Sequence, residues 1–235
     1  MPSASDHHHL LSRLRDEIRR IERRPARRAG ALPCGLAAVD ALLPGGFPCG
    51  ALTELRGGPA SGKTAVALAT VAGLPRGALA AWVDGRRELY PPAAAALGVD
   101  LSRLLIVRPP AGEAGGRLAL WAAEVLLGSG AFAAVALDVP LERGGRGLDP
   151  ALRRLVTAAE QGGAAGLWLS PERGSVSGTV RPPASLRLEV RTEVRGGARR
   201  IVAARADGAG QVAAEATEAR SPAALRRRAG GVHAA

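Results

Sequence analysis

The sequence GGPASGKT, residues 57–64, joins two apolar runs, ALTEL before it and AVALATVA after it. It matches the pattern G-x-x-x-x-G-K-[ST] of a phosphate-binding loop, which lies between a strand and a helix. The glycines let the backbone pass close to phosphate oxygens, and the amino end of the following helix attracts the anion. Lys63 is the only lysine among the 32 Lys and Arg residues of the chain. This is consistent with a position where the planar fork of arginine does not fit.

We therefore predict a nucleotide site with ATP as its ligand, in which Lys63 reaches the β- and γ-phosphates and Thr64 helps to hold Mg²⁺. Such a site also needs an acid at the end of a nearby strand. Asp138 ends the apolar run AFAAVALD, so the predicted metal ligands are Thr64 and Asp138. Asp84, at the end of ALAAWVD, is a second acid in a similar position. The predicted nucleotide-binding residues are Gly57, Gly58, Pro59, Ala60, Ser61, Gly62, Lys63 and Thr64.

The sequence around this loop alternates apolar runs of strand length with segments of helical periodicity. This alternation predicts an α/β fold, mainly a parallel sheet with helices on both faces. After residue 180, alternating apolar and charged residues predict an antiparallel C-terminal extension. Strands are expected over 51–55, 78–84, 103–107, 131–138, 164–170, 185–194, 198–206 and 211–216, and helices over 62–72, 91–98, 117–128 and 149–162.

The bulk composition suits one domain. The chain has 235 residues, of which 47% are apolar but only 3% aromatic, so the core must consist of Ala, Leu and Val. We expect a core over 31–218, preceded by a basic amphipathic helix and linker over 1–30 and followed by a flexible basic tail over 219–235. No apolar run is long enough to span a membrane, and the N-terminus lacks the apolar region of a signal peptide. We therefore expect a cytoplasmic, nucleoid-associated protein with no membrane partner.

The positive charge lies mostly at the two ends of the chain. The net charge is +11; residues 1–30 hold eight arginines against four acids, and residues 219–235 hold four arginines and no acid. Basic ends of this kind attract polyanions, most often nucleic acid, although a solvated surface would have the same composition. Apolar residues at helical spacing before Pro25 predict a helix with one apolar face. The residues expected to dock a partner or DNA are Leu10, Leu14, Ile18, Ile21, Arg226, Arg227 and Arg228.

Several segments, in this order, resemble the RecA recombinase family. They are GLAAVDALLPGGFPCGALTELRGGPASGKTAVALA (35–69), AAWVDGRRELYPPAAAALGVDLSRLLIV (80–107), AFAAVALD (131–138) and ASLRLEVR (184–191). The resemblance implies a RecA-like core that uses ATP and Mg²⁺ and contacts single-stranded DNA. The short length and the wording of the first segment are more similar still to the ImuA group, which comprises accessory factors of damage-induced (SOS) translesion synthesis. That similarity implies an ImuB-like polymerase relative, RecA itself and an error-prone polymerase as partners.

The chain departs from the family's pattern at residues that the resemblance makes catalytic. A RecA-like protein carries a water-activating glutamate two residues after the aspartate that ends the second strand, and Arg86 stands there. Arginine stays charged and cannot take a proton from water. Pro171 stands where a glutamine senses the γ-phosphate, and only Arg205 is available for the cross-protomer cation. Base assistance is worth ~10²–10⁴ in rate and a trans cation ~10³–10⁵, so we expect weak or absent ATP hydrolysis.

Arginines also lie in the two loops that meet single-stranded DNA in RecA-like folds. Phosphate contacts from arginine would give sequence-independent, salt-sensitive binding. The candidate DNA-binding residues are Arg143, Arg146, Arg173 and Arg181. Three functions remain open at this point. The first is an accessory protein of translesion synthesis that binds DNA and partner proteins. The second is an active DNA-dependent ATPase and recombinase of the RecA type. The third is an interaction protein that binds neither ATP nor DNA.

Overall fold

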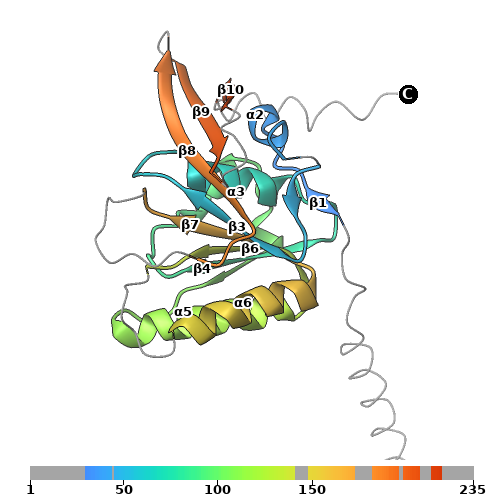
Figure 1. The fold of residues 1–235 in the computed structure, drawn as a ribbon, viewed down its shortest axis with the longest axis vertical. Coiled ribbons are helices and arrows are strands. Elements are labelled where there is room, and N and C mark those ends of the chain that lie inside the picture. The colour runs from blue at the N-terminus through green and yellow to red at the C-terminus, as the bar shows by residue number, and fades with distance from the viewer. Residues whose placement is uncertain are drawn as a thin grey trace, which may run out of the picture.

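A computed structural model describes residues 30–43, 45–140, 148–172, 182–195, 198–206 and 213–218. Within these residues the chain builds one large sheet of eight strands, in the order β10-β9-β8-β3-β7-β6-β4-β5 (Figure 1). The strands are β3 (Ala51–Arg56), β4 (Leu79–Asp84), β5 (Leu104–Val107), β6 (Phe132–Asp138), β7 (Ala165–Ser170), β8 (Leu186–Arg195), β9 (Ala198–Arg205) and β10 (Ala213–Glu218). Each lies within two or three residues of a range predicted from periodicity.

The six strands from β8 to β5 run parallel to one another, and β9 and β10 continue the sheet antiparallel. The α/β fold with an antiparallel C-terminal extension is therefore confirmed. The change of direction comes one strand later than the sequence suggested, because β8 pairs parallel with β3 on one side and antiparallel with β9 on the other. Its alternating pattern reflects a half-exposed strand near the edge of the sheet, and this pattern does not determine the direction of the neighbouring strand.

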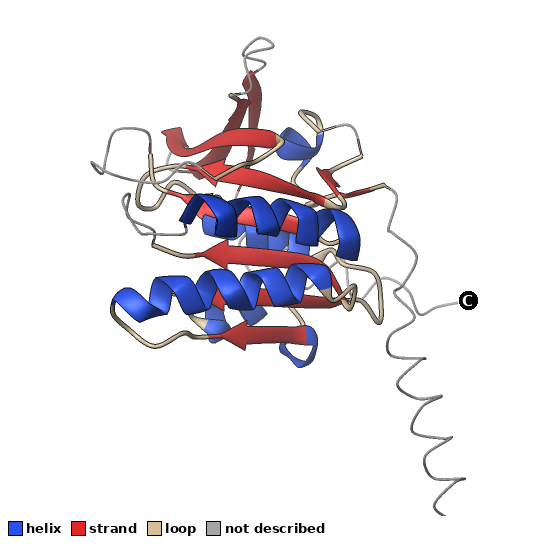
Figure 2. Cartoon of the chain, turned by 60° about the horizontal axis from the view of Figure 1, so that its bottom comes forward, coloured by secondary structure: helices blue, strands red, loops and turns tan. Residues whose placement is uncertain are grey.

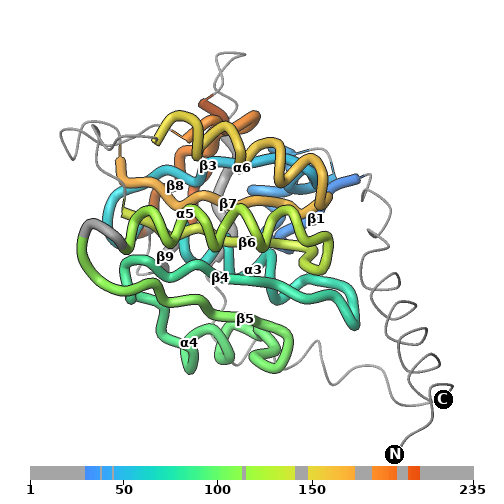
Figure 3. Tube along the Cα trace, turned by 90° about the horizontal axis from the view of Figure 1, so that it is seen from below, coloured from blue at the N-terminus to red at the C-terminus, as the bar shows by residue number. Residues whose placement is uncertain are grey.

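Helices cover both faces of the sheet, and each face has its own apolar core. Helices α5 (Glu113–Gly128) and α6 (Leu148–Gly162) lie side by side over one face, as Figures 2 and 3 show. The other face carries α3 (Lys63–Ala72), α2 (Ala37–Asp40) and α4 (Pro91–Ala96). Ala, Leu and Val dominate both cores, as composition predicted, and the largest fully buried side chain is Trp82.

The N-terminal part of the described chain is more ordered than a linker. Strand β1 (Ala31–Leu32) pairs antiparallel with β2 (Phe47–Pro48) in a small separate sheet. Residues 31 and 32 therefore belong to a paired strand. The carboxylate of Asp40 fastens this region, because it accepts hydrogen bonds from the backbone N–H groups of Cys34 and Gly35 at 2.8 and 2.9 Å. The predicted amphipathic helix lies outside the described residues.

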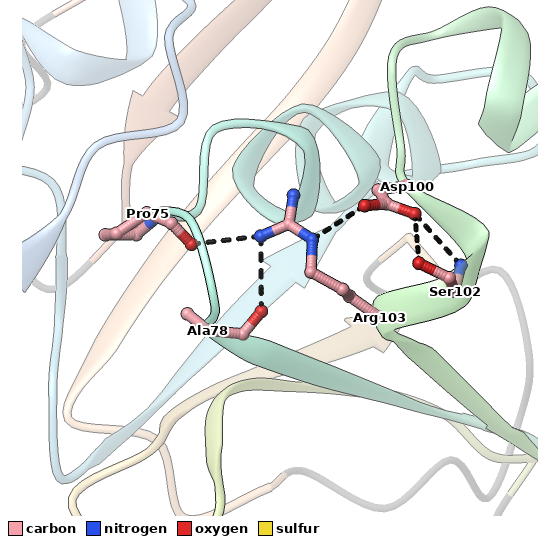
Figure 4. A network of polar contacts seen from close by, with 5 residues as sticks. All are labelled: Pro75, Ala78, Asp100, Ser102 and Arg103. Carbon is pink, nitrogen blue, oxygen red and sulfur yellow. Dashed lines mark hydrogen bonds and ion pairs between the residues drawn. The ribbon is translucent and has the colours of Figure 1, made fainter.

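Two polar networks connect neighbouring elements. Arg103, in the short helix η1 (Leu101–Arg103), donates to Asp100 at 2.9 Å and to the carbonyls of Pro75 and Ala78 at 3.0 and 3.4 Å (Figure 4). It thereby joins the turn after α3 to the start of β5. A second network is buried between β3 and β8, where the Glu54 carboxylate pairs with Arg56 at 2.8 Å and Arg187 at 3.0 Å. Among the helices described, none is long and apolar enough to cross a membrane.

Candidate phosphate-binding site

The predicted phosphate loop connects the end of β3 to the start of α3, as the motif requires (Figure 1). Gly62 is the N-cap of α3 and has φ +93, a left-handed conformation that favours glycine. Gly57 is needed for a different reason, since a Cβ there would lie 2.3 Å from the Val190 carbonyl oxygen and 2.4 Å from Ser61 Oγ. Its N–H donates to the Ser170 carbonyl at the end of β7. The loop is thus packed tightly against β7 and β8.

Lys63, the first residue of α3, folds back over the loop. Its Nζ donates to the carbonyl oxygens of Gly57 and Gly58 at 2.9 and 3.2 Å. Burial lowers the pKa of Lys63, an effect partly offset by the negative charges of Asp138 and Glu88 and reinforced by the positive charge of Arg86. The ammonium group of Lys63 therefore lies among neutral carbonyl acceptors. It is close enough to Asp138 for the two charges to interact.

The hydroxyl of Ser61 lies inside the same loop. Ser61 is only 7% exposed, and its Oγ has no hydrogen-bond partner among the described residues. A buried hydroxyl without a partner costs free energy unless something else supplies an acceptor or donor. Within this loop, an oxygen of a bound phosphate would supply the acceptor.

Asp138 ends β6, with β7 between it and the phosphate loop. Its carboxylate is buried, and Arg86 Nε lies 3.0 Å from Oδ1. The geometry is that of an ion pair and not of an aligned hydrogen bond, because Oδ1 accepts none from the described residues. Burial raises the pKa of Asp138 to about 6, against the lowering effect of the Arg86 charge. Arg86 is thus a cation in direct contact with one of the two predicted metal ligands.

Asp84 determines where Arg86 lies. Asp84 is fully buried at the end of β4, and its Oδ1 accepts from the N–H groups of Glu88 and Leu89 at 3.0 and 3.3 Å. Its Oδ2 accepts from Arg108 Nε at 2.9 Å. Asp84 ends β4 as expected, but both of its oxygens are used to shape the turn after that strand.

The same turn is fastened to the end of β6. The N–H groups of Gly85 and Arg86 donate to the Asp138 carbonyl at 2.9 and 3.3 Å. A Cβ on Gly85 would lie 3.2 Å from that carbonyl oxygen, so the close approach depends on glycine. The backbone therefore places the Arg86 side chain beside the Asp138 side chain.

A family model described as the RecA N-terminal domain matches residues 15–140, more than half of the chain. The chain belongs to the RecA family. RecA-family relatives with the name Protein RecA include that of Salinispora tropica, 42% identical over 52% of this chain and 34% of the relative. Protein RecA of Symbiobacterium thermophilum is 44% identical over 46% of this chain and 30% of the relative. The chain spans about a third of the length of these relatives.

Membership of the RecA family implies a Mg²⁺ ion bound with the nucleotide. The predicted ligands, Asp138 and Thr64, are not arranged to bind that ion in this structure. Mg²⁺ takes oxygen ligands in nearly ideal octahedral geometry, usually with one or two carboxylates. The Asp138 carboxylate already faces the Arg86 guanidinium at 3.0 Å, and a divalent cation there would be repelled by it. Thr64 is exposed on the first turn of α3 and offers one neutral hydroxyl. Among the described residues, no three His, Cys, Asp or Glu side chains form a metal-binding group.

Of the other residues singled out from the sequence of this RecA-family chain, some lie within the described residues and the rest lie outside them. Pro171 directly follows β7, and the exposed Glu172 carboxylate lies 3.3 Å from the position of a Cβ on Gly58. Arg205 ends β9, at the far side of β8 from the phosphate loop. The remaining candidates lie outside the described residues; they are Arg143, Arg146, Arg173, Arg181, Leu10, Leu14, Ile18, Ile21, Arg226, Arg227 and Arg228.

Two contacts at the candidate site were not predicted from the sequence. The sequence marks Arg86 as a departure from the RecA-family pattern but not as the partner of Asp138, and it does not indicate the contact of Arg108 with Asp84. The register of the parallel strands β4 and β6 holds the signal, because Asp84 is aligned with Asp138. Two strands predicted to be neighbours, each ending in aspartate and with arginines nearby, would have suggested paired charges at one edge of the sheet.

Proposed function

We propose that this RecA-family protein is an accessory factor of damage-induced translesion synthesis. It would bind DNA and partner proteins, hold a nucleotide at the phosphate loop, and hydrolyse ATP weakly or not at all. The proposed nucleotide ligands are the loop residues 57–64, with Lys63 as the phosphate cation. The proposed partners are an ImuB-like polymerase relative, RecA and an error-prone polymerase, as the resemblance to the ImuA group implies.

The Arg86–Asp138 ion pair carries this proposal. Water activation needs a group that can accept a proton near the γ-phosphate, and arginine cannot do so. Here Arg86 also forms an ion pair with the Asp138 carboxylate, which would otherwise be available to hold the metal. Glu88, two residues after Arg86, is exposed, and its backbone N–H serves the turn shaped by Asp84. The retained loop and the altered catalytic position together favour holding a nucleotide over hydrolysing it.

One exposed surface supports a role in binding partner proteins. Leu118, Trp121 and Val125 follow one another at helical spacing on the outer side of α5 and are 43, 63 and 50% exposed. Three large apolar side chains in a row are unusual for a face in contact only with water. Aromatic residues are also enriched where proteins contact one another.

An active recombinase of the RecA type is the second candidate. Two observations favour it: the intact phosphate motif, and the fact that the similar relatives bear the name Protein RecA. Against it stand Arg86 and Pro171 at positions where the resemblance expects a catalytic glutamate and a sensing glutamine.

ATP hydrolysis with and without single-stranded DNA separates the two candidates. We expect turnover near background in both conditions, and no difference between the wild-type chain and Lys63→Ala. Brisk, DNA-stimulated turnover that Lys63→Ala abolishes would overturn the accessory function and favour the recombinase. Binding of labelled single-stranded DNA, measured at several salt concentrations in the same samples, tests the DNA contact, which we expect to weaken steeply with salt.

A further inference from the structure

The phosphate loop presents a cation that lacks an anionic partner. Lys63 Nζ contacts two neutral carbonyl oxygens and takes part in no ion pair with a described residue. Its pKa is lowered mainly by burial, and the charges of Asp138 and Glu88, which form no ion pair with it, offset this lowering only in part. A group of this kind is stabilised when an anion enters beside it.

Ser61 provides independent evidence of a missing ligand. Its hydroxyl is enclosed by the loop, near enough to Gly57 to exclude a Cβ there, and has no partner among the described residues. Its residue is 93% buried, so bulk water does not replace the missing partner. Both the buried hydroxyl and the lysine would be satisfied by phosphate oxygens.

Arg86 has unused hydrogen-bond donors at the same edge of the sheet. Its Nε faces Asp138, whereas its two terminal nitrogens make no hydrogen bond with described residues, and its side chain is 31% exposed. The charges of Arg86 and Glu88 act on both Lys63 and Asp138, which places these four groups in one electrostatic cluster. The planar guanidinium fork suits phosphate oxygens, which it binds through two parallel hydrogen bonds.

We propose that the loop binds the triphosphate of a nucleotide without a divalent cation, with the Arg86 guanidinium taking the place beside Asp138 that a magnesium ion would need. Lys63 and Arg86 supply two positive charges, and Asp138 holds Arg86 in position. A magnesium ion and the guanidinium compete for one carboxylate, so the metal is not required and its chelation of the triphosphate weakens binding. This inference rests on the proposed function for the identity of its ligand.

The test is binding of a fluorescent, non-hydrolysable ATP analogue to the full-length chain, with excess EDTA or with excess Mg²⁺. The wild-type protein should bind at least as tightly in EDTA as in Mg²⁺. Arg86→Gln should weaken binding in EDTA by about 10-fold or more, as expected for a lost charge-assisted contact. Arg86→Lys should retain part of the affinity. Arg86→Glu should make binding depend on Mg²⁺, because it frees Asp138 and adds a carboxylate.

Arg87→Gln is the matched control, because its guanidinium donates to the Pro109 carbonyl and not to Asp138. It should leave binding in EDTA within about twofold of wild type, a change of less than 0.5 kcal/mol. Circular dichroism melts confirm that each variant is folded. Wild-type binding that requires Mg²⁺ would overturn this inference and leave the accessory function in place. No binding in either condition would overturn both this inference and the nucleotide-holding part of the proposed function. Brisk hydrolysis, measured separately with ATP, would overturn the accessory function itself.

Discussion

Arg86 Nε lies 3.0 Å from Asp138 Oδ1 at the point where β4 and β6 end side by side. The pair is formed although burial opposes charge on Asp138 and raises its pKa to about 6. Between about pH 4 and pH 6 the folded protein therefore binds a proton that the unfolded chain releases. A group with a raised folded pKa makes the folded state less stable as pH rises through this window.

Replacing Asp138 by Asn removes this titration. The free energy of unfolding of the wild-type protein should fall relative to Asp138→Asn as pH rises from 4 to 7, by up to about 3 kcal/mol, since each pKa unit corresponds to about 1.4 kcal/mol. Urea unfolding of both proteins across this range measures the difference. Parallel pH profiles for the two proteins would contradict the raised pKa.

The buried ion pairs of Glu54 should matter more for stability than exposed ones. Glu54 is 2% exposed and pairs with Arg56 and Arg187 between β3 and β8. Glu54→Ala leaves Arg187 without its carboxylate and Arg56 with only the exposed Glu189 at 3.6 Å, and it should cost about 3–5 kcal/mol of unfolding free energy. The control is Glu124→Ala, which removes the exposed pair with Arg154 and should cost at most about 1 kcal/mol. Equal losses in chemical denaturation would refute this account of the β3–β8 contact.

Gly62 links the phosphate loop to the C-terminal strands. It has φ +93, and a Cβ there would lie 3.0 Å from Ile201 Cγ1 and 3.4 Å from Thr192 Oγ1. Gly62→Ala should therefore pay both for the left-handed conformation, about 1–2 kcal/mol, and for the contact with β9. Gly77→Ala is the matched control, because Gly77 has φ +81 with no atom within 4 Å of the Cβ position. Thermal or urea unfolding should show a larger loss of stability for Gly62→Ala than for Gly77→Ala. Equal losses would contradict a costly contact with β9.

Lys63→Arg tests why the chain keeps one lysine. Lys63 is half-buried and reaches two carbonyls of a tight loop. A branched, planar guanidinium is a poor substitute for a compact ammonium in that space, so Lys63→Arg should weaken binding of the ATP analogue about as much as Lys63→Ala. Arg76→Lys, at an exposed position, controls for the exchange of Lys and Arg elsewhere in the chain, and this variant should bind the ATP analogue as the wild-type protein does. If Lys63→Arg bound the ATP analogue with wild-type affinity, the positive charge alone, and not the shape of the side chain, would determine binding.

The sequence predicted most of the fold because the elements carry strong periodicity. The runs ending at Asp84 and Asp138, the loop 57–64 and the helix after it all lie where the pattern placed them. The site was predicted less completely, because its decisive contact joins residues far apart in the chain. Arg86 and Asp138 meet only because β4 and β6 are neighbours in register, which no local pattern specifies. The direction of β8 escaped prediction for the same reason.

Single-turnover hydrolysis shows whether this protein cleaves the ATP that it binds, because it separates chemistry from nucleotide binding and product release. Excess full-length protein is mixed with a trace of radiolabelled ATP, Mg²⁺ and single-stranded DNA, and the ADP formed is followed over time. We expect ATP to remain almost entirely intact, with a rate of hydrolysis indistinguishable from that of Lys63→Ala. Rapid conversion of bound ATP to ADP, lost in Lys63→Ala, would contradict this expectation.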